Sequence, residues 1–555
     1  MREKQFNLVD SPWILVKDQE EHTEEVSLEE VLINAQDYRC LSGETAAQDA
    51  AIRRFLVAIN HAVITEMSPR VEDEEEALDR WEEIWKEGKL PEQAIKEYLA
   101  RWKDKFWLID PDGGFLQSKT AAIGTDYKAP KLTGDLAESN NKLRLFQLRS
   151  GEAKEGLSMA EAARWLLNVN AYDDTSAKAK GTKPNGEKFP SIGAGWLGKL
   201  GQIYAQGRNL FETIMLNTVL LKEDGTRWGP DKPYWEVEES EPIKQRESLS
   251  IPDNQAGLLT FPSRLLLLKE QDGRITGFNL LGGGFFDKTD AFNEPFTIWR
   301  PVKGKKNDPV HFVPRRHNSS RQIWRDFSSI AGFGKEKEGE PYHLPGIITW
   351  IKTLKSESLI PDSQLIEFNM PFVQYGDKDF FVTDTSSQSL VMYPLLLTEA
   401  GVDWRTIIEE EINKIDKAAN AAGRLAETTA MASGNSSDSV SKCAESGRTL
   451  AYEAADQPFR TWLASLDPKI YADEATRQKK REELQIQLRR CLLRLERRIV
   501  GSPPVNALFS REIMEGGKKV RVLSIPEAEM RFESQINKLY PKLSSKKVKQ
   551  NGKEK

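Results

Sequence analysis

The sequence has little of what disulfide frameworks, zinc sites and membrane anchors require. Its three cysteines, Cys40, Cys443 and Cys491, lie far apart in a chain of 555 residues, so they predict neither a disulfide framework nor a zinc knuckle. No apolar run approaches the roughly 20 residues of a membrane span. The first residues lack the apolar segment of a signal peptide. We therefore expect a cytoplasmic protein without membrane contact.

Enzyme motifs are also missing. The chain has no Walker A sequence, no His-Asp metal doublet and no paired-His motif, and it has only five histidines. Such motifs place the groups that bind nucleotide or metal, so their absence disfavours a nuclease or a helicase. We expect no catalytic residue, no metal site and no cofactor.

Neither sign of charge dominates, but each is concentrated in places. The formal net charge is −6, which disfavours a protein that coats nucleic acid by itself. Acidic residues concentrate in 20–30 and 72–76, and basic residues in 489–498 and 542–555. An acidic body can therefore carry a local electropositive face. A plain solvated surface remains the alternative for each of these runs.

The residue patterns predict an α+β protein. We expect a large mixed α/β domain over residues 1–395, an antiparallel four-helix bundle over 396–541, and a disordered basic tail over 542–555. The bundle follows from four amphipathic helices joined by short connections. These helices are expected at 403–425, 440–466 and 474–500, and after a cap at Ser524.

Within the first domain the pattern alternates between helix and strand. Helices are expected at 28–35, 48–64, 74–85, 92–102 and 157–167. The first and last of these open on a serine followed three residues later by a glutamate, which is capping-box spacing. Strands are expected at 6–10, 12–16, 106–108, 258–268, 274–280, 297–301 and 380–383. His61 has no His or Cys partner at metal-ligand spacing, and we expect it at the rim of its helix.

A glycine-rich stretch at 191–217 stands out. Gly193-Ala194-Gly195-Trp196-Leu197-Gly198 matches the G-x-G-x-x-G pattern of dinucleotide-binding folds. That motif needs a preceding strand and a helix that opens on it, whereas residues 183–190 have the composition of a turn-rich loop. A dinucleotide site is therefore disfavoured. Turn glycines in a surface loop, or a loop that a partner approaches closely, both remain open.

Residues 115–136 are expected to form a long loop, which is unusual in a compact domain unless the loop is functional or mobile. Lysines beside an aromatic residue suit a single-stranded nucleic-acid backbone, although a disordered loop fits as well. The candidate residues are Phe115, Gln117, Lys119, Lys128 and Lys131.

Two further basic groups are candidates for phosphate contact. His311, Arg315, Arg316, His317 and Arg321 cluster beside Trp324, and they fit phosphate contact or plain surface equally well. The helix expected at 474–500 carries more arginines than its few glutamates can neutralise, and exposed arginines grip phosphates without reading sequence. These arginines are Arg489, Arg490, Arg494, Arg497 and Arg498.

The order of these parts resembles the large subunit of Cascade, the RNA-guided surveillance complex of type I-E CRISPR systems (the CasA family). The matching pieces are FNLVDSPWILV near the N-terminus, GGFLQ, LSMAEAARWLL, the glycine stretch running into GRNLFETIMLN, NQAGLLTFPSRLLLL, and the expected C-terminal bundle. They span nearly the whole chain.

The resemblance implies a non-catalytic recognition subunit. It would hold the 5′ handle of the guide RNA, contact the backbone, small and handle-binding subunits, and read the protospacer-adjacent motif (PAM) of double-stranded DNA through the minor groove. It would then help to open the duplex, hold the displaced strand and recruit a separate helicase-nuclease for antiviral defence. A narrow minor groove suits glycine backbone, and a wedge between base pairs trades unstacking for strand separation.

The resemblance also assigns candidate residues. The glycine loop falls on Gly193, Ala194 and Gly195, the lysine finger on Lys288, and the guide-handle loop on the 115–136 candidates. The wedge should follow Gln374-Tyr375, but there the chain has Gly376, Asp377, Lys378 and Asp379 instead of the expected Asn-Gln pair.

Two other classes of function remain open. One is a protein–protein adaptor whose bundle docks partners without reading DNA. The other, a nuclease or helicase, is disfavoured by the missing motifs.

Overall fold

The structure is a computed structural model, and it describes residues 3–67, 74–134, 156–175, 193–237, 248–302, 309–332, 342–509, 511–515 and 518–542. The tail beyond 542 and residues 135–136 of the expected loop lie outside the described residues. The chain divides into two compact units, Met1–Leu390 and Val391–Lys555.

The first unit begins with short antiparallel pairings. Strand β1 (Gln5–Asn7) pairs with β5 (Trp107–Ile109), and β2 (Ile14–Asp18) is the central strand between β3 (Thr23–Val26) and β4 (Tyr38–Leu41). Helix α1 (Leu28–Ile33) starts at the predicted capping box of Ser27 and Glu30. Both reciprocal hydrogen bonds of that box are present, so the cap prediction is confirmed.

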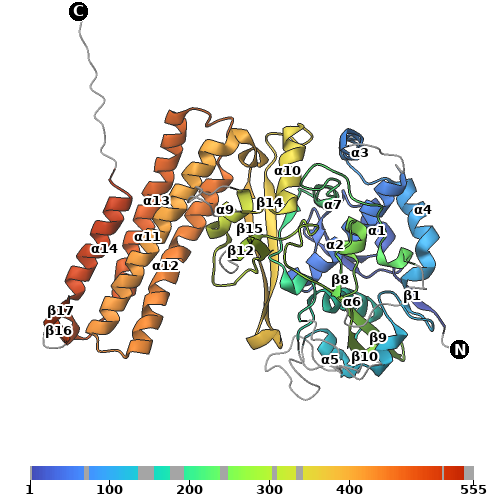
Figure 1. Cartoon of the computed structure of the whole chain (residues 1–555), viewed down its shortest axis with the longest axis horizontal. Coiled ribbons are helices and arrows are strands. Elements are labelled where there is room, and N and C mark those ends of the chain that lie inside the picture. The colour runs from blue at the N-terminus through green and yellow to red at the C-terminus, as the bar shows by residue number, and fades with distance from the viewer. Residues whose placement is uncertain are drawn as a thin grey trace, which may run out of the picture. The chain divides into compact units, whose positions relative to one another are not determined.

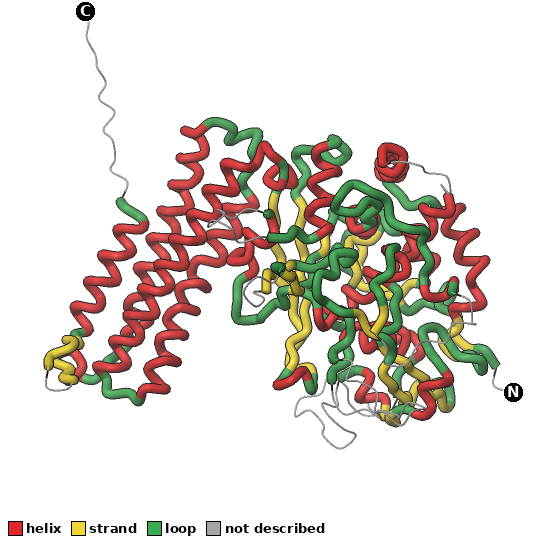
Figure 2. The backbone as a smooth tube through the Cα atoms, viewed as in Figure 1, coloured by secondary structure: helices red, strands yellow, loops and turns green. Residues whose placement is uncertain are grey.

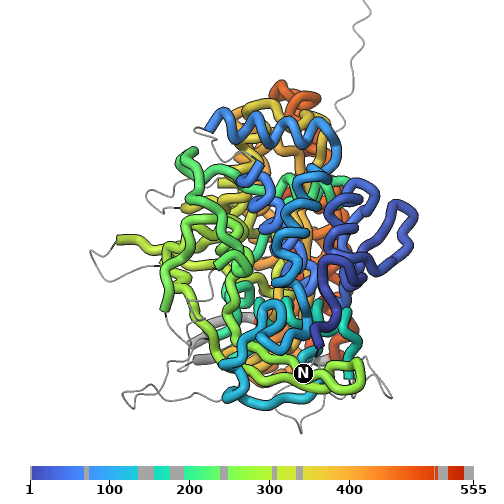
Figure 3. Tube along the Cα trace, turned by 90° about the vertical axis from the view of Figure 1, so that its right-hand side faces the viewer, coloured from blue at the N-terminus to red at the C-terminus, as the bar shows by residue number. Residues whose placement is uncertain are grey.

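Helix α2 (Ala46–Met67) forms the core of the first unit. Its side chains from Ala50 to Ile64 are buried on every face, as expected for a helix that other elements surround. It contacts α4 (Glu92–Trp102), α6 (Met159–Tyr172), α7 (Leu210–Asn217) and α8 (Gln255–Leu259). Helices α3 (Glu74–Glu87) and α4 lie on the face that Figure 3 turns toward the viewer.

Two three-stranded antiparallel sheets position the candidate site. One has the order β6 (Thr125–Lys128), β10 (Arg274–Gly282), β9 (Arg264–Gln271), and the other β15 (Val382–Met392), β14 (Ile366–Tyr375), β7 (Tyr204–Gln206). Strands β14 and β15 form the long hairpin seen in Figures 1 and 2. Smaller elements complete the unit: α5 (Ala129–Leu132), β8 (Ser248–Leu249), β11 (Phe285–Phe286), β12 (Trp299–Val302), β13 (His311–Pro314), α9 (Phe327–Ala331) and α10 (Gly346–Ser356).

The second unit consists mainly of four helices, α11 (Val402–Ala432), α12 (Ser437–Ala464), α13 (Glu474–Val500) and α14 (Ile525–Leu539). Helix α11 packs on the other three, and α13 also contacts α12 and α14. Buried Leu484, Leu488, Leu492 and Leu495 form the inward face of α13. Their spacing of three and four residues produces one apolar stripe, as the sequence predicted.

Several local predictions were wrong. The expected strand at 258–268 is split, because Asn254 caps the short helix α8 before β9 begins at Arg264. The expected loop at 115–136 contains a strand, β6, and a short helix, α5. Strand β14 and the hairpin β16 (Arg511–Glu515) with β17 (Lys518–Leu523) were not predicted. His61 is buried and does not lie at a rim.

Across the described ranges, no helix is long and apolar enough to cross a membrane.

Candidate nucleic-acid interface

The first described residue of the glycine loop has a backbone conformation that favours glycine. Gly193 has φ +70°, and a Cβ placed there would meet only the Lys199 side chain, at 3.6 Å. Gly195 is different, because a Cβ there would lie 2.3 Å from the carbonyl oxygen of Ala171. Ala194 is buried between them. Gly193 therefore has free space beside it, whereas Gly195 is required by packing.

A buried ion pair holds this loop in place. The Arg264 Nε atom lies 2.5 Å from Asp173 Oδ2, and both side chains are almost fully buried. The same guanidinium donates through Nη2 to the carbonyl oxygen of Gly193 at 2.8 Å. The Gly195 N–H donates to the carbonyl oxygen of Asp173 at 2.9 Å. The end of α6 and the start of β9 thus fix both ends of the loop.

The loop forms one wall of an open hollow with a volume of about 780 Å³. Lys288, Arg316 and Asp379 also line it. The structure therefore brings together the predicted glycine loop, the predicted lysine finger and the last residue of the predicted wedge turn. These residues come from three segments far apart in the sequence.

Positive charges crowd this hollow. Lys199 also lines it, with its Nζ atom 5.7 Å from the centre of the Phe285 ring. Burial, together with the nearby positive charges of Arg264, Lys288 and Arg316, lowers the pKa of Lys199 to about 8. A lysine is hard to keep charged among other cations. An anion in the hollow would relieve that repulsion.

Arg316 has an acidic partner in the hollow. Its Nη1 and Nη2 atoms lie 3.0 and 3.1 Å from the two carboxylate oxygens of Asp379. This parallel geometry is the fork that arginine also uses for phosphate. The guanidinium carbon lies 5.4 Å from the centre of the Tyr375 ring. Arg316 is thus oriented by an aromatic face and an acid.

The predicted wedge turn joins β14 to β15 in a constrained conformation. Lys378 and Asp379 both have positive φ, +54° and +59°, which is uncommon for residues other than glycine. The Thr175 N–H donates to the carbonyl oxygen of Asp379 at 2.8 Å, and its hydroxyl donates to that of Lys378 at 2.7 Å. Next to them, Phe380 exposes 44% of its surface. The turn is tied to the segment that follows α6, two residues from Asp173.

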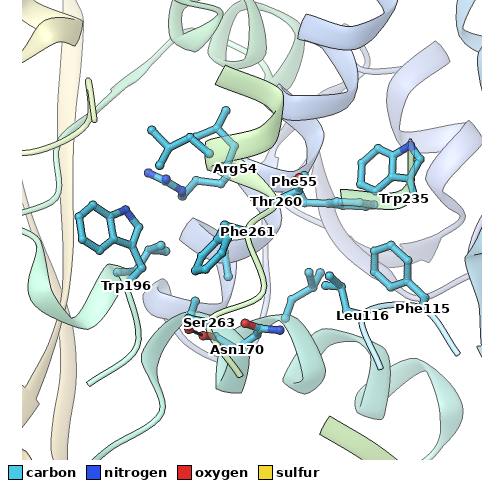
Figure 4. Close-up of a pocket in the computed structure, with 16 residues that line it drawn as sticks. Arg54, Phe55, Phe115, Leu116, Asn170, Trp196, Trp235, Thr260, Phe261 and Ser263 are labelled. Carbon is cyan, nitrogen blue, oxygen red and sulfur yellow. Dashed lines mark hydrogen bonds between the residues drawn. The ribbon is translucent and has the colours of Figure 1, made fainter. Parts of the chain in front are cut away.

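The predicted guide-handle residues divide into two groups. Phe115 lines a small cavity of about 40 Å³ with Phe55 and Trp235 (Figure 4). Gln117 is buried, donates to the carbonyl oxygen of Leu108 at 2.6 Å and accepts from the Leu268 N–H at 2.8 Å.

The lysines of this set divide in the same way. Lys131 is buried, with its Nζ atom 2.9 Å from Asp174 Oδ2, so it stabilises the fold together with Phe115 and Gln117. Lys119 and Lys128 are exposed. They are the two members of the set that face solvent.

The basic cluster beside Trp324 does not form one patch. Arg315 and Arg321 both bind Asp326, and His311 Nδ1 lies 2.5 Å from Asp290 Oδ2. His317 is bonded to the carbonyl oxygen of Gln202, and burial lowers its pKa. Acidic or backbone partners thus take up much of the charge that the sequence concentrates here.

The arginines of α13 are arranged differently. Arg490, Arg494, Arg497 and Arg498 are exposed and have no ion-pair partner among the described residues. Arg489 donates to Asn537 Oδ1 on α14, through Nε at 3.0 Å and Nη2 at 2.6 Å. Within the described ranges, four of the five predicted arginines thus face solvent without an acidic partner.

One small group of possible metal ligands occurs in the described part of the chain, at the β2–β3 turn. It comprises Asp18, Glu20 and His22. The backbone N–H groups of Glu20 and His22 donate to Asp18 Oδ1 at 2.8 and 2.9 Å. These bonds are those of an ordinary exposed turn.

Two important residues were missed from the sequence: Lys199, which lines the hollow, and Arg264, which holds its glycine loop. Lys199 directly follows the third glycine of the G-x-G-x-x-G pattern, and Arg264 interrupts the apolar run at 258–268. A charged residue inside such a run needs a partner if it is buried, which was the available signal for Arg264. Nothing in the sequence separates Lys199 from an ordinary surface lysine.

Comparisons with known proteins agree with one another. The family model described as CRISPR-associated protein Cse1 matches residues 7–495. The crystal structure of Thermobifida fusca Cse1 has a TM-score of 0.78 at 26% identity, over 97% of this chain and 98% of that chain. A chain of a CRISPR RNA-guided surveillance complex shares the fold, with a TM-score of 0.60 at 16% identity over 96% and 99% of the two chains.

A curated relative is the CRISPR-associated protein CasA/Cse1 of Thermus thermophilus. It is 28% identical over 334 residues, which are 59% of this chain and 60% of the relative. The chain thus spans about 60% of the length of the curated relative it matches.

Proposed function

The chain belongs to the CRISPR-associated protein Cse1 family, and from this premise we propose that it is the non-catalytic large subunit of an RNA-guided type I-E surveillance complex. In this role it recognises the PAM in double-stranded DNA, helps to open the duplex and recruits the helicase-nuclease. The observation that carries the proposal is the hollow in which Gly193, Lys288 and Asp379 meet.

Reading of the PAM is assigned to the glycine loop and Lys288. The minor groove is only about 6 Å wide and presents a degenerate pattern of acceptors. Gly193 offers backbone without a side chain at a point where space is free, and exposed Lys288 can donate to base acceptors from the same hollow. Within the chain, the Arg264 guanidinium holds this loop through the carbonyl oxygen of Gly193.

Duplex opening is assigned to the turn between β14 and β15. Aromatic and aliphatic side chains act as wedges in minor-groove proteins by partly unstacking a base step. Phe380 is the exposed phenylalanine nearest to this turn, and Thr175 holds the two carbonyl groups that precede it. Phe380 therefore suits the wedge better than Lys378 or Asp379, since phosphate would repel the Asp379 carboxylate.

The remaining partners are assigned to other surfaces. Lys119 and Lys128 are the exposed candidates for the 5′ handle of the guide RNA. The second unit, which we interpret as a four-helix bundle, would hold DNA backbone on its α13 arginines and contact other subunits. Exposed arginines suit sequence-independent binding to phosphates.

The experiment uses the complex reconstituted with its guide RNA and two target duplexes that differ only in the PAM. In the Gly193→Asn variant we expect the preference for the correct PAM to be lost while the complex still assembles. Asparagine tolerates positive φ, so the loop keeps its backbone while a side chain enters the hollow.

Gly273→Asn is the matched control. Gly273 has φ +75° and nothing within 4 Å of an added Cβ, and we expect that variant to bind like the wild type. Gly195 is unsuitable, because a side chain there collides with Ala171. If Gly193→Asn discriminates as well as the wild type, the glycine loop is a structural turn. If complexes without the subunit keep the same PAM preference, the protein is an adaptor and the proposed function is wrong.

A further inference from the structure

Asp379 is an unexpected residue at this place. It is the acid at the end of the β14–β15 turn, it lines a hollow otherwise rich in positive charge, and it accepts both hydrogen bonds of the Arg316 fork. Lys199, which also lines the hollow, is half-buried and has no ion-pair partner among the described residues. Within the described part of the chain, one cation of the hollow is thus paired with an acid and another is not.

We propose that the hollow is a binding site for a phosphate group of the nucleic-acid backbone, formed by Arg316 and Lys199 with Lys288 at its edge, and that the Asp379 carboxylate occupies Arg316 when no nucleic acid is bound. The proposal rests on the proposed function, because that function brings DNA to the hollow. It adds an internal competitor to the site.

The geometry supports an exchange of one anion for another. A carboxylate and a phosphate present the same pair of oxygens to a guanidinium. The side chains of Arg316 and Asp379 are 37% and 31% exposed, so water can solvate the carboxylate once it leaves. Ion pairs that are this open to solvent are weak. A phosphate, which can bind Arg316 and Lys199 together, should displace the carboxylate.

The exchange does not require the turn to refold. Thr175 binds the backbone carbonyl groups of Lys378 and Asp379, and not their side chains. Tyr375, at the end of β14, is also held, because its hydroxyl donates to the carbonyl oxygen of Tyr172 at 2.6 Å. The Asp379 side chain can therefore rotate away while the turn keeps its place beside the hollow.

The electrostatics of Lys199 support the same site independently. Its ammonium lies among Arg264, Lys288 and Arg316, with Asp287 as the attractive charge, and its pKa is lowered to about 8. Arg264 is already neutralised by Asp173. When Asp379 rotates away, Arg316 loses its paired carboxylate, and Asp287 is the one acid left among the described residues that line the hollow.

The test is a double-mutant cycle on DNA binding by the assembled complex. Asp379→Asn keeps the shape of the side chain and removes its charge, so we expect it to tighten binding of the target duplex by about 3- to 10-fold at low salt. Arg316→Gln should weaken binding by about 10-fold and reduce the salt dependence by the equivalent of about one phosphate contact. Lys199→Gln should weaken it by a similar factor.

The combined variant decides between competition and a general charge effect. If Asp379 acts by occupying Arg316, Asp379→Asn should have no effect in the Arg316→Gln background, because the two changes are then strongly coupled. Asp384→Asn is the matched control. Asp384 is an exposed acid on β15, outside the turn, that does not pair with Arg316, and its variant should bind like the wild type.

The outcomes separate this proposal from the proposed function. The proposal is overturned if Asp379→Asn and Asp384→Asn tighten binding equally, or if Asp379→Asn tightens it as much without Arg316 as with it. It is also overturned if Arg316→Gln and Lys199→Gln leave affinity unchanged while Gly193→Asn still abolishes PAM preference, a result in which the proposed function survives. If none of these variants changes DNA binding, both are wrong.

Discussion

The hollow beside Gly193 and the arginine row of α13 carry the same kind of charge in opposite arrangements. In the hollow, Lys199, Lys288 and Arg316 converge around one space, and Arg316 is already paired with an acid. On α13, Arg490, Arg494, Arg497 and Arg498 follow one another along an exposed helix. The first arrangement can select one phosphate in one orientation, whereas the second adds attraction without orientation.

The support beneath the two regions differs as well. The glycine loop depends on the buried Arg264–Asp173 pair, because the Arg264 guanidinium also donates to the Gly193 carbonyl oxygen. The α13 arginines depend only on the apolar stripe of their own helix. We therefore expect mutations of the Arg264–Asp173 pair to affect folding and recognition together, and mutations of the α13 arginines to affect binding alone.

The largest effect is expected from Arg264→Ala. Loss of the guanidinium leaves the Asp173 carboxylate buried without its partner, and breaking a buried pair typically costs about 3–5 kcal/mol. The first unit should unfold at clearly lower denaturant concentration, as followed by the fluorescence of its tryptophans. Arg497→Ala, on the exposed face of α13, is the comparison and should shift the transition by less than about 0.5 kcal/mol.

Arg264→Lys sharpens this test. Lysine keeps the positive charge but cannot make the several directed bonds of the guanidinium, so stability should recover in part while PAM preference does not. Full recovery of both stability and PAM preference would mean that Arg264 contributes only its charge. The proposed difference between the glycine loop, which is held by directed hydrogen bonds, and the exposed arginines of α13 would then be wrong.

The next largest effect is expected on α13. Changing Arg490, Arg494, Arg497 and Arg498 to Gln together should weaken binding of correct-PAM and altered-PAM duplexes by the same factor, about 10- to 100-fold at about 50 mM salt and much less at about 200 mM. Binding measured across salt concentrations with both duplexes checks this.

Two results would contradict this interpretation of α13. A selective loss for one duplex would mean that the row reads sequence, contrary to its geometry. An unchanged affinity would favour a bundle that serves only as a protein-docking surface. Arg489→Gln is an internal comparison, because Arg489 is already engaged by Asn537, and it should have the smallest effect of the five arginines.

The same contrast explains which features the sequence could predict. Regular patterns were reliable: the capping box at Ser158 and Glu161 and the helix at 474–500 appear where apolar spacing and local polar bonds placed them. The expected strand at 258–268 was wrong because the side chain of Asn254 accepts from the Gly257 N–H and starts a helix there. That local bond outweighed the strand propensity of an apolar run.

The site was less predictable than the helices. Counting lysines in 115–136 could not show that Lys131 is buried against Asp174 while Lys128 is exposed, since the acid lies more than 40 positions away in the sequence. The hollow could not be predicted for the same reason, because Lys199, Lys288 and Arg316 come from separate segments that only the fold brings together. Residue type indicated which side chains can bind phosphate, and long-range packing decided which of them lie together in one site.

The smallest expected effect concerns pH, and it distinguishes the two regions most directly. The pKa of Lys199 is lowered to about 8, below its ordinary value of about 10.4, by burial and by the charges of Arg264, Lys288 and Arg316, with Asp287 opposing them. Lys199 is therefore charged below about pH 8 and loses its proton above it. Arginines keep their charge throughout this range.

Binding of the target duplex should accordingly weaken by a few-fold between about pH 7 and about pH 9. Lys199→Gln should remove most of this pH dependence, whereas the variant with the four α13 arginines changed to Gln should retain it. The direction of this pH dependence follows from the charge of the DNA phosphate, which binds the protonated lysine best and therefore binds most tightly below the pKa of Lys199. The opposite sign holds for folding, because the unfolded chain keeps its proton between about pH 8 and about pH 10.4 while the folded chain has lost it, and stability rises with pH in that interval. If the pH dependence of binding survives in Lys199→Gln, the titrating group is not Lys199. That result would contradict the argument that converging charge, and not the number of charges, sets the selectivity of DNA binding.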